Sequence, residues 1–384
     1  MRRPLQLLAI LLVLGSASAA TPFTVGVIVS KEGTARVSGD AEALAAIAYA
    51  SRVRASGGVF GTPLEVRVED DAGDPTKAVQ AARTLIGDGV DALVCCTTEA
   101  ASEPVARLAE TSGVVLLSPS SLQGAGGTPY WSFSLAPRDQ DTLAAVVADA
   151  SARGLGSLAL MTLDNGFGDV AVKDLKALLS VAGLGYAGEA RYPPGADVLT
   201  PEALWIATRQ PGGVVVWGLK NDLLIAIDGL DRRGYRGPVY ARSALLKPVM
   251  GGLALGRLEG VRFAVAPVTV AQGLPTTATC ADAARTAADR LHGVYGGVID
   301  LAPAAAVYDA IDLLKAAFEQ VAALRLPDSD ASARRQAVRD SLVGLPPTCG
   351  AGGLYDLREG RRDAVEPAGL AIAVVRGGRL VAAP

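Results

Sequence analysis

Three short polar runs offer the side chains best suited to recognise a small molecule, and each follows an apolar segment. They are Thr97-Thr98-Glu99, Ser118 to Ser121, and Asp164-Asn165. Hydroxyl, carboxylate and amide groups supply directed hydrogen bonds, and a few of these orient a ligand in a mainly apolar cleft. The runs therefore indicate the binding of a polar solute.

Catalysis has little support among the same residues. A hydrolytic nucleophile needs a base within reach, and the single histidine, His292, lies in a helical segment far in sequence from Ser120. A G-x-S-x-G elbow near a strand end and the phosphate-binding G-x-x-x-x-G-K-[ST] loop are both absent. Adjacent Asp70 and Asp71 fit a turn after a strand. We expect no enzyme, no metal and no other cofactor.

The segments that position these runs alternate between strand and helix. Apolar segments rich in Val, Leu and Ile predict strands at 23–29, 64–69, 92–96, 114–117, 158–162, 213–217 and 239–240. Helical periodicity predicts helices at 40–54, 76–87, 101–112, 139–153, 169–182 and 223–234. This alternation occurs in two rounds. It predicts an α/β protein with two doubly wound parallel-sheet lobes, joined by hinge crossovers around a ligand cleft. Ligands of such sheets bind beyond the carboxyl ends of the strands, where the polar runs stand.

The last 120 or so residues are predicted to complete these lobes. Helical segments at 281–292, 303–324 and 331–342 precede a hairpin formed by 370–375 and 379–382. We divide the chain into a signal peptide (1–20), a first lobe (21–137 with 267–352) and a second lobe (138–266 with 353–384).

The first twenty residues have the three parts of a secretory signal peptide. Arg2 and Arg3 carry positive charge, Leu5 to Leu14 is apolar, and Ala17-Ser18-Ala19 has the small residues that a signal peptidase recognises. The apolar run is shorter than the ~20 residues that span a bilayer. We expect a secreted protein of the periplasm or extracytoplasmic space that does not itself span the membrane. A net charge of −3 gives no basic face for nucleic acid, and we expect a monomer.

Four cysteines, Cys95, Cys96, Cys280 and Cys349, allow three pairings. An oxidising compartment favours disulfides, and we predict Cys280–Cys349, which would close a long loop in the C-terminal half. Adjacent Cys95 and Cys96 end an apolar strand. They form either a vicinal disulfide or two small buried hydrophobic side chains, which is the commoner fate of free cysteine.

Several motifs in this order and spacing resemble the branched-chain amino-acid-binding family of ABC-transporter receptors, the type I periplasmic binding proteins. The motifs are Gly57 to Gly61, Glu69 to Pro75 followed by Ala78-Val79, Gly113 to Ser120, Asp164 to Gly168, and Val307 to Ala310. The resemblance implies a receptor that delivers a small polar solute, an amino acid or related compound, to an ABC-transporter permease. The alternatives are a ligand-sensing protein for a chemoreceptor or signalling partner, and a binder of amide, urea-like or aromatic solutes.

The resemblance also assigns residues of the first lobe to the pocket. The family holds the ligand carboxylate with a hydroxyl and backbone N–H groups after the third strand, so Thr98 is a candidate contact, and a helix N-cap is the alternative. Glu99 falls where close relatives carry an anion-binding serine. It either satisfies the helix macrodipole or accepts a cationic or amide N–H group. Ser120 and Ser121 match a loop that offers a carbonyl and a hydroxyl, and Leu122 stands where threonine is usual.

In the second lobe, the family's acidic residue for the ligand ammonium is missing. Arg242 or Ser243 stands in its place. An arginine binds a carboxylate bidentately, so Glu99 with Arg242 would invert the usual polarity, whereas an ordinary surface arginine is the alternative. Phe167 matches an aromatic residue that closes over the ligand, or it packs in the cleft wall. Trp217 stacks on the ligand or packs in the core. These departures make a leucine-type ligand less expected than the resemblance alone implies.

Overall fold

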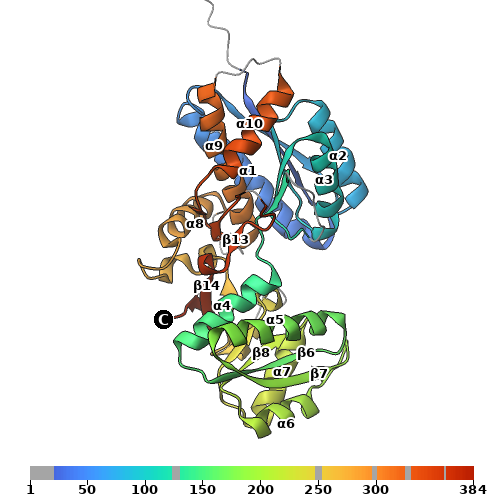
Figure 1. Cartoon of the computed structure of the whole chain (residues 1–384), viewed down its shortest axis with the longest axis vertical. Coiled ribbons are helices and arrows are strands. Elements are labelled where there is room, and N and C mark those ends of the chain that lie inside the picture. Colours follow the sequence, from blue (N-terminus) through green and yellow to red (C-terminus); the bar gives the residue numbers. More distant parts are fainter. Residues whose placement is uncertain (1–20, 123–129, 247–252, 296–300, 325–329, 359) are drawn as a thin grey trace, which may run out of the picture.

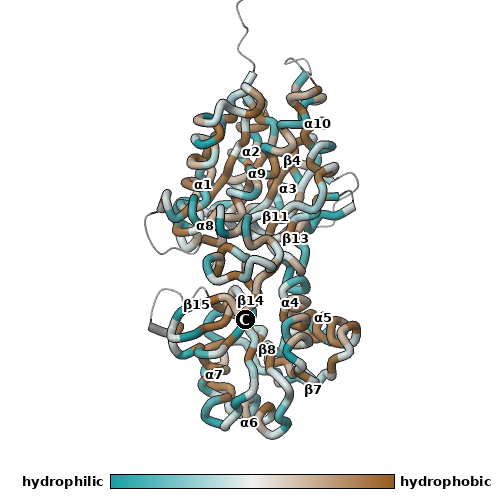
Figure 2. Tube along the Cα trace, turned by 90° about the vertical axis from the view of Figure 1, so that its left-hand side faces the viewer, coloured by the Kyte–Doolittle hydropathy of each residue, from teal (hydrophilic) through white to brown (hydrophobic). Residues whose placement is uncertain are grey.

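The computed structural model describes residues 21–122, 130–246, 253–295, 301–324, 330–358 and 360–384. The signal peptide predicted at 1–20 lies outside the described residues. Two α/β lobes follow one another along the long axis of the molecule (Figure 1). Apolar residues follow the sheets and the inner faces of the helices, and hydrophilic residues lie outside (Figure 2). In the described part of the chain, none of the helices has the combined length and apolarity that a membrane span requires.

The first lobe is built on a parallel sheet of order β2-β1-β3-β4-β5. Its strands are β1 (Phe23–Val29), β2 (Leu64–Asp70), β3 (Ala92–Cys95), β4 (Val115–Ser118) and β5 (Ser132–Ser134). Its helices are α1 (Arg36–Ala55), α2 (Pro75–Gly87), α3 (Glu99–Ser112), α8 (Ala281–Tyr295), α9 (Leu301–Leu324) and α10 (Ala331–Val343). Helices α1, α9 and α10 share one apolar core with one face of the sheet, and α2 and α3 share another core with the opposite face. Because β1, β3 and β4 are covered on both faces, each is a continuous buried run.

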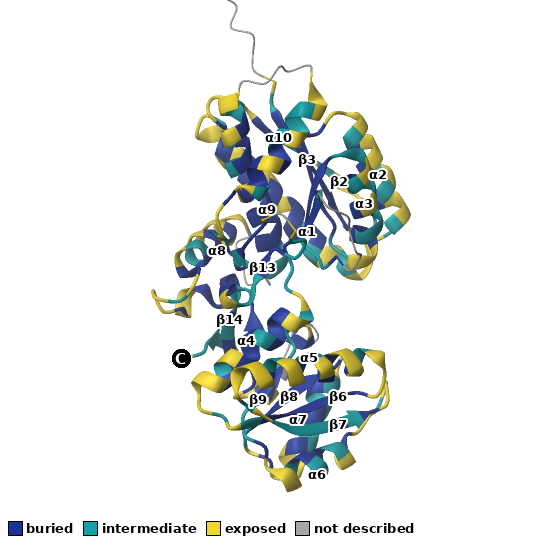
Figure 3. Cartoon of the chain, viewed as in Figure 1, coloured by how far each residue is buried: buried dark blue, intermediate teal, exposed yellow. Residues whose placement is uncertain are grey.

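The second lobe has a sheet of order β15-β14-β10-β9-β8-β6-β7. The strands are β6 (Ser157–Leu163), β7 (Gly185–Tyr192), β8 (Gly213–Trp217), β9 (Val239–Ala241), β10 (Arg262–Val265), β14 (Ala371–Arg376) and β15 (Arg379–Ala382). Helices α4 (Asp139–Ala152) and α5 (Gly166–Ala182) cover one face, and α6 (Thr200–Arg209) and α7 (Asp222–Arg232) cover the other. The residues of the sheets and of the inner helix faces are mostly buried, and those of the outer helix faces are exposed (Figure 3).

The two lobes share one strand order. In each, the second strand along the chain lies outside the first, and the third, fourth and fifth follow on the other side. The order therefore reverses between β1 and β3 and again between β6 and β8, and such a reversal point is where open α/β sheets bind ligands. The expected two-lobed α/β architecture is confirmed, with β14 and β15 added as an antiparallel extension.

Most elements match the predicted ranges to within a few residues, and strands β1 and β8 match at both ends. The elements without a prediction include β5, β7, β10 and α6. Strand β7 lies at a sheet edge and buries only Ala190 and Tyr192, so it lacks a continuous apolar run. A small sheet of β11 (Thr348–Cys349), β12 (Leu354–Tyr355) and β13 (Val365–Glu366) was not predicted either. Short 3-10 turns are η1 (Gly33–Ala35), η2 (Ser243–Leu246), η3 (Leu253–Leu258), η4 (Pro267–Gly273) and η5 (Pro367–Gly369).

Three connections join the lobes: β5 to α4, β10 to η4, and β13 to β14. Residues 353–366, placed in the second lobe from the sequence, include β12 and β13. Strand β12 pairs with β11 and with β13, and Ser134 N donates to Arg362 O at 2.8 Å beside β5. We propose that the lobes divide at the three connections, with the last boundary near residue 366.

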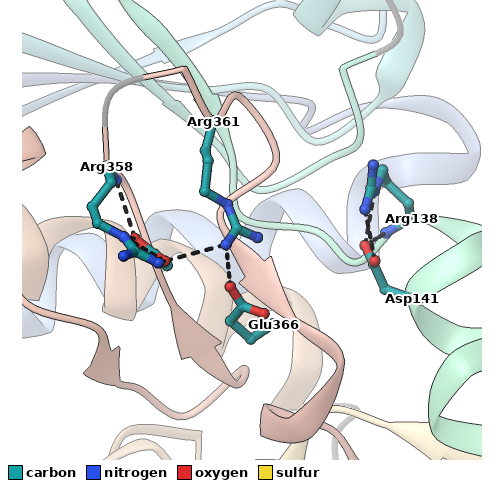
Figure 4. A network of polar contacts seen from close by, with 6 residues as sticks. Arg138, Asp141, Arg358, Arg361 and Glu366 are labelled. Carbon is teal, nitrogen blue, oxygen red and sulfur yellow. Dashed lines mark hydrogen bonds and ion pairs between the residues drawn. The ribbon is translucent and has the colours of Figure 1, made fainter.

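Charged side chains brace two of these connections (Figure 4). Arg138 donates to Asp141 through Nε at 3.0 Å and Nη2 at 2.8 Å, and it lies 3.5 Å from Asp363. Arg361 bridges the buried Asp356, at 3.2 Å, and Glu366. Through Asp363, the first connection is thereby tied to the segment between β12 and β13.

Candidate functional site

A cavity of about 470 Å³ lies between the carboxyl ends of the two sheets. The first lobe lines it with the loops after β3, β4 and β5 and with one side of α1. The second lobe lines it with β10, the loop after β9 and the start of α4. The start of α9, the β11–β12 turn and Tyr355 complete the wall. Both lobes thus contribute to a single site.

Helix α1 reaches the cavity because it packs tightly on the end of β1. A Cβ atom at Gly39 would lie only 2.0 Å from the carbonyl oxygen of Ser30, so a larger residue would push the helix away. The close approach brings Glu42 into the wall, buried at 3 % exposure. Thr97 connects the two elements, since its hydroxyl accepts from Ser30 N at 3.0 Å and donates to Glu42.

The start of α3 supplies Glu99 but not Thr98 to the cavity. Thr98 occupies the N-cap position, its side chain makes no capping hydrogen bond, and it is not among the cavity-lining residues. Glu99 is the first residue of the helix, is exposed, and lines the cavity. This position fits both alternatives predicted from the sequence, namely compensation of the helix macrodipole and contact with a ligand.

Ser120 and Ser121 both line the cavity, and hydroxyl groups behind them hold the loop. Ser120 Oγ lies 2.7 Å from Ser102 Oγ, and Ser118 Oγ donates to the carbonyl of Ser120 at 2.7 Å. Ser102 also accepts from Cys96 N at 2.9 Å. The loop after β4 is thereby fixed to the loop after β3. Leu122 is buried in the apolar core on the α2–α3 side.

Arg242 and Ser243 line the cavity from the second lobe. Arg242 Nε donates to Asp139 Oδ1 at 2.8 Å, so Asp139, at the start of α4, holds the guanidinium group. The guanidinium carbon lies 5.5 Å from the ring centre of Phe167 and 6.0 Å from that of Trp217, within the range of a cation–π contact.

Phe167 and Trp217 themselves are not among the cavity-lining residues. Trp217 is 1 % exposed and packs in the second-lobe core, which is one of its two predicted positions. Phe167 is placed by Asn165, whose Oδ1 accepts from Phe167 N at 3.0 Å and caps α5. Both rings therefore lie beside the guanidinium group of Arg242 and outside the cavity wall.

Sequence reasoning named Thr97 as part of a polar run but missed other polar residues of the wall: Ser38, Glu42, Asp139, Thr142 and Tyr355. Of these five, only Asp139 carried a usable signal, since it opens a predicted helix. Glu42 lies within a helix whose local pattern marks it as an ordinary charged residue.

Tyr355 is anchored from inside the first lobe. Its hydroxyl donates to Asp309 at 2.9 Å, and the same carboxyl group accepts from Ala351 N and Gly352 N. Burial raises the pKa of Asp309 to about 7, although these three hydrogen bonds act in the opposite direction.

All four cysteines form disulfides. The Cys280–Cys349 bond has an S–S distance of 2.10 Å and is the pairing predicted from the sequence. Of the two alternatives for Cys95 and Cys96, the structure has the vicinal disulfide, with both residues fully buried. Within the described residues, no group of three or more His, Cys, Asp and Glu side chains has the arrangement of a metal site.

A family model described as periplasmic binding protein matches residues 22–379. The chain belongs to this family. Leu/Ile/Val-binding protein homolog 3 of Brucella melitensis is 31 % identical over 109 residues, which is 28 % of this chain and 30 % of that protein. The matched region is thus less than a third of that relative's length. The resemblance to branched-chain amino-acid receptors, drawn from the motifs, is confirmed by the family match and this relative.

Solved structures support the fold of this periplasmic binding protein over nearly its whole length. An extracellular ligand-binding receptor from Rhodopseudomonas palustris superposes with a TM-score of 0.72 at 21 % identity, covering 95 % of this chain and 99 % of that one. An ABC transporter substrate-binding protein from Desulfitobacterium hafniense, in complex with Leu, has a TM-score of 0.70 at 18 % identity, covering 94 % and 100 %. Members of this family bind solutes. The family is named for the periplasm, the compartment in which its members act.

Proposed function

We propose that this chain is an extracytoplasmic receptor that captures an amino acid or a related polar solute and delivers it to an ABC-transporter permease. The observation that carries the proposal is the cavity between the carboxyl ends of the two sheets, lined by polar groups of both lobes. A ligand that contacts both walls holds the lobes together, which is the basis of hinge closure. The similarity to the Brucella melitensis protein, which is named as a homolog of Leu/Ile/Val-binding protein, supports an amino-acid-like solute.

A purely binding role is supported by the chemistry of the wall. The described cavity-lining residues include no histidine and no cysteine, and the hydroxyl of Ser120 is engaged with Ser102. A hydroxyl becomes a nucleophile only beside a general base that can take its proton. Export by the N-terminal twenty residues would bring the receptor to the periplasm, where it meets its permease.

The proposal is tested with mature protein purified from the periplasm. Native mass spectrometry would detect a retained solute, and a thermal-shift screen over amino acids, amides and urea-like compounds would identify it. A solute at 100 times its Kd stabilises the folded state by about 2.7 kcal/mol. We expect at least one compound to raise the Tm and to be recovered unchanged. Recovery of a chemically altered compound, or no stabilisation by any of these compounds, would contradict the proposal.

A further inference from the structure

The charged residues of the described cavity wall are unevenly distributed between the lobes. Glu42 and Glu99 belong to the first lobe, and the second lobe contributes Arg242 together with Asp139. The first-lobe wall therefore presents two carboxyl groups and no cationic side chain among its described residues, whereas the second-lobe wall carries a guanidinium group paired with one carboxylate.

We propose that the cleft binds a zwitterionic solute with its ammonium group toward Glu42 and Glu99 and its carboxylate toward Arg242. This inference rests on the proposed receptor function and adds the orientation of the solute and the residues that set it.

The first-lobe wall disfavours a carboxylate. Glu42 is buried in this wall, and its carboxyl group accepts the Thr97 hydroxyl. Glu99 stands at the start of α3, so it already supplies the negative charge that a helix N-terminus attracts. A second anion beside these two carboxylates would meet repulsion in a partly desolvated site. An ammonium group would be attracted to both, and the Ser120 and Ser121 hydroxyls can accept its remaining hydrogen bonds.

The second-lobe wall provides a fixed acceptor site. Arg242 is anchored through Nε to Asp139 and backed by the rings of Phe167 and Trp217. Within the described part of the chain, its Nη atoms donate no hydrogen bond. A guanidinium group held in this way presents its two terminal nitrogens to a carboxylate in a preorganised fork.

The orientation is tested by isothermal titration calorimetry of the mature protein with the twenty proteinogenic amino acids. The tightest binder is then compared with its primary amide and its N-acetyl derivative, which lack the carboxylate and the ammonium charge respectively. We expect both derivatives to bind at least tenfold more weakly than the free amino acid.

Substitutions separate the two orientations by the sign of their effect. With the ammonium group at the first lobe, Glu99→Gln and Arg242→Gln each weaken binding of that amino acid at least tenfold, and Asp139→Asn changes it less than threefold. With the opposite orientation, Glu99→Gln tightens binding, because a repulsion is removed, and Asp139→Asn weakens it. Glu103→Gln, one turn along α3, and Arg236→Gln, on an exposed loop, are the matched controls and should stay within twofold. Arg242→Lys, which keeps the charge and loses the fork, replaces Arg242→Gln if that variant does not fold.

The outcomes distinguish this inference from the receptor function. Tighter binding by Glu99→Gln, or preference for the amide, contradicts the orientation and leaves the receptor function standing. Failure of all twenty amino acids, with an amine or urea-like compound binding instead, overturns the zwitterion alone. Failure of every compound contradicts both.

Discussion

Tyr355 donates its hydroxyl hydrogen to Oδ2 of Asp309 at 2.9 Å, joining a residue of the cavity wall to a carboxyl group buried in the first lobe. The same carboxyl group accepts hydrogen bonds from Ala351 N at 2.8 Å and from Gly352 N at 2.7 Å. The turn that carries Gly352 and Tyr355 into the cavity is therefore held by one side chain of α9.

The stability of this arrangement depends on pH. Burial raises the pKa of Asp309 from 3.8 to about 7, so the folded protein binds a proton that the unfolded chain releases. The contribution of Asp309 is thus largest below pH 4 and is lost as the pH rises to 7. We therefore subtract the unfolding free energy of Asp309→Asn from that of the wild type. We expect this quantity to fall by about 3 kcal/mol from pH 4.5 to 7.5. Urea titrations of both proteins at several pH values measure this change. A difference that stays constant with pH would contradict the raised pKa of Asp309.

Two glycines at the start of α5 should respond differently to alanine. A Cβ atom at Gly168 would lie 1.9 Å from the carbonyl oxygen of Leu163, whereas one at Gly166 has nothing within 4 Å. Gly168→Ala should therefore destabilise the protein by at least ~2 kcal/mol through backbone displacement, and Gly166→Ala should be neutral or stabilise it by up to ~1 kcal/mol. Chemical denaturation of both variants tests this close approach, and similar unfolding free energies for the two would exclude it.

The disulfide between Cys280 and Cys349 spans 69 residues of chain. Loop entropy predicts that the double variant Cys280→Ser/Cys349→Ser loses about 4 kcal/mol, because its unfolded state gains freedom. The loss is measured by urea unfolding without reductant. Equal unfolding free energies of variant and wild type would show that the bond does not restrict the unfolded chain.

Ligand binding should draw the lobes together. The cavity is lined from both sides, and three short connections are the only links between the lobes within the described residues. A stabilising solute is expected to lower the radius of gyration measured by small-angle X-ray scattering. Arg242→Gln, at matched solute concentration, should show a smaller decrease. Identical scattering with and without saturating solute would rule out closure.

Predictability from the sequence follows the way each element is buried. Strands β1 and β8 were located at both ends, because a strand covered on both faces must be a continuous apolar run. The edge strand β7 and the three-residue strand β5 leave no such run. In the site, Glu99, Ser120 and Ser121 belong to polar runs predicted after strands, Arg242 and Ser243 were predicted from the family resemblance, and all five line the cavity.

The amino-acid sequence by itself determined the two rounds of strand and helix, the family, and the loops that carry the site, since these depend on local periodicity and order along the chain. Only the tertiary structure decided which side chains share the cavity. Asp139 and Arg242 stand 103 residues apart, and Glu42 reaches the wall only because Gly39 lets α1 rest on the end of β1. Contacts of this kind depend on packing between elements that are distant in the sequence, so local sequence patterns do not predict them.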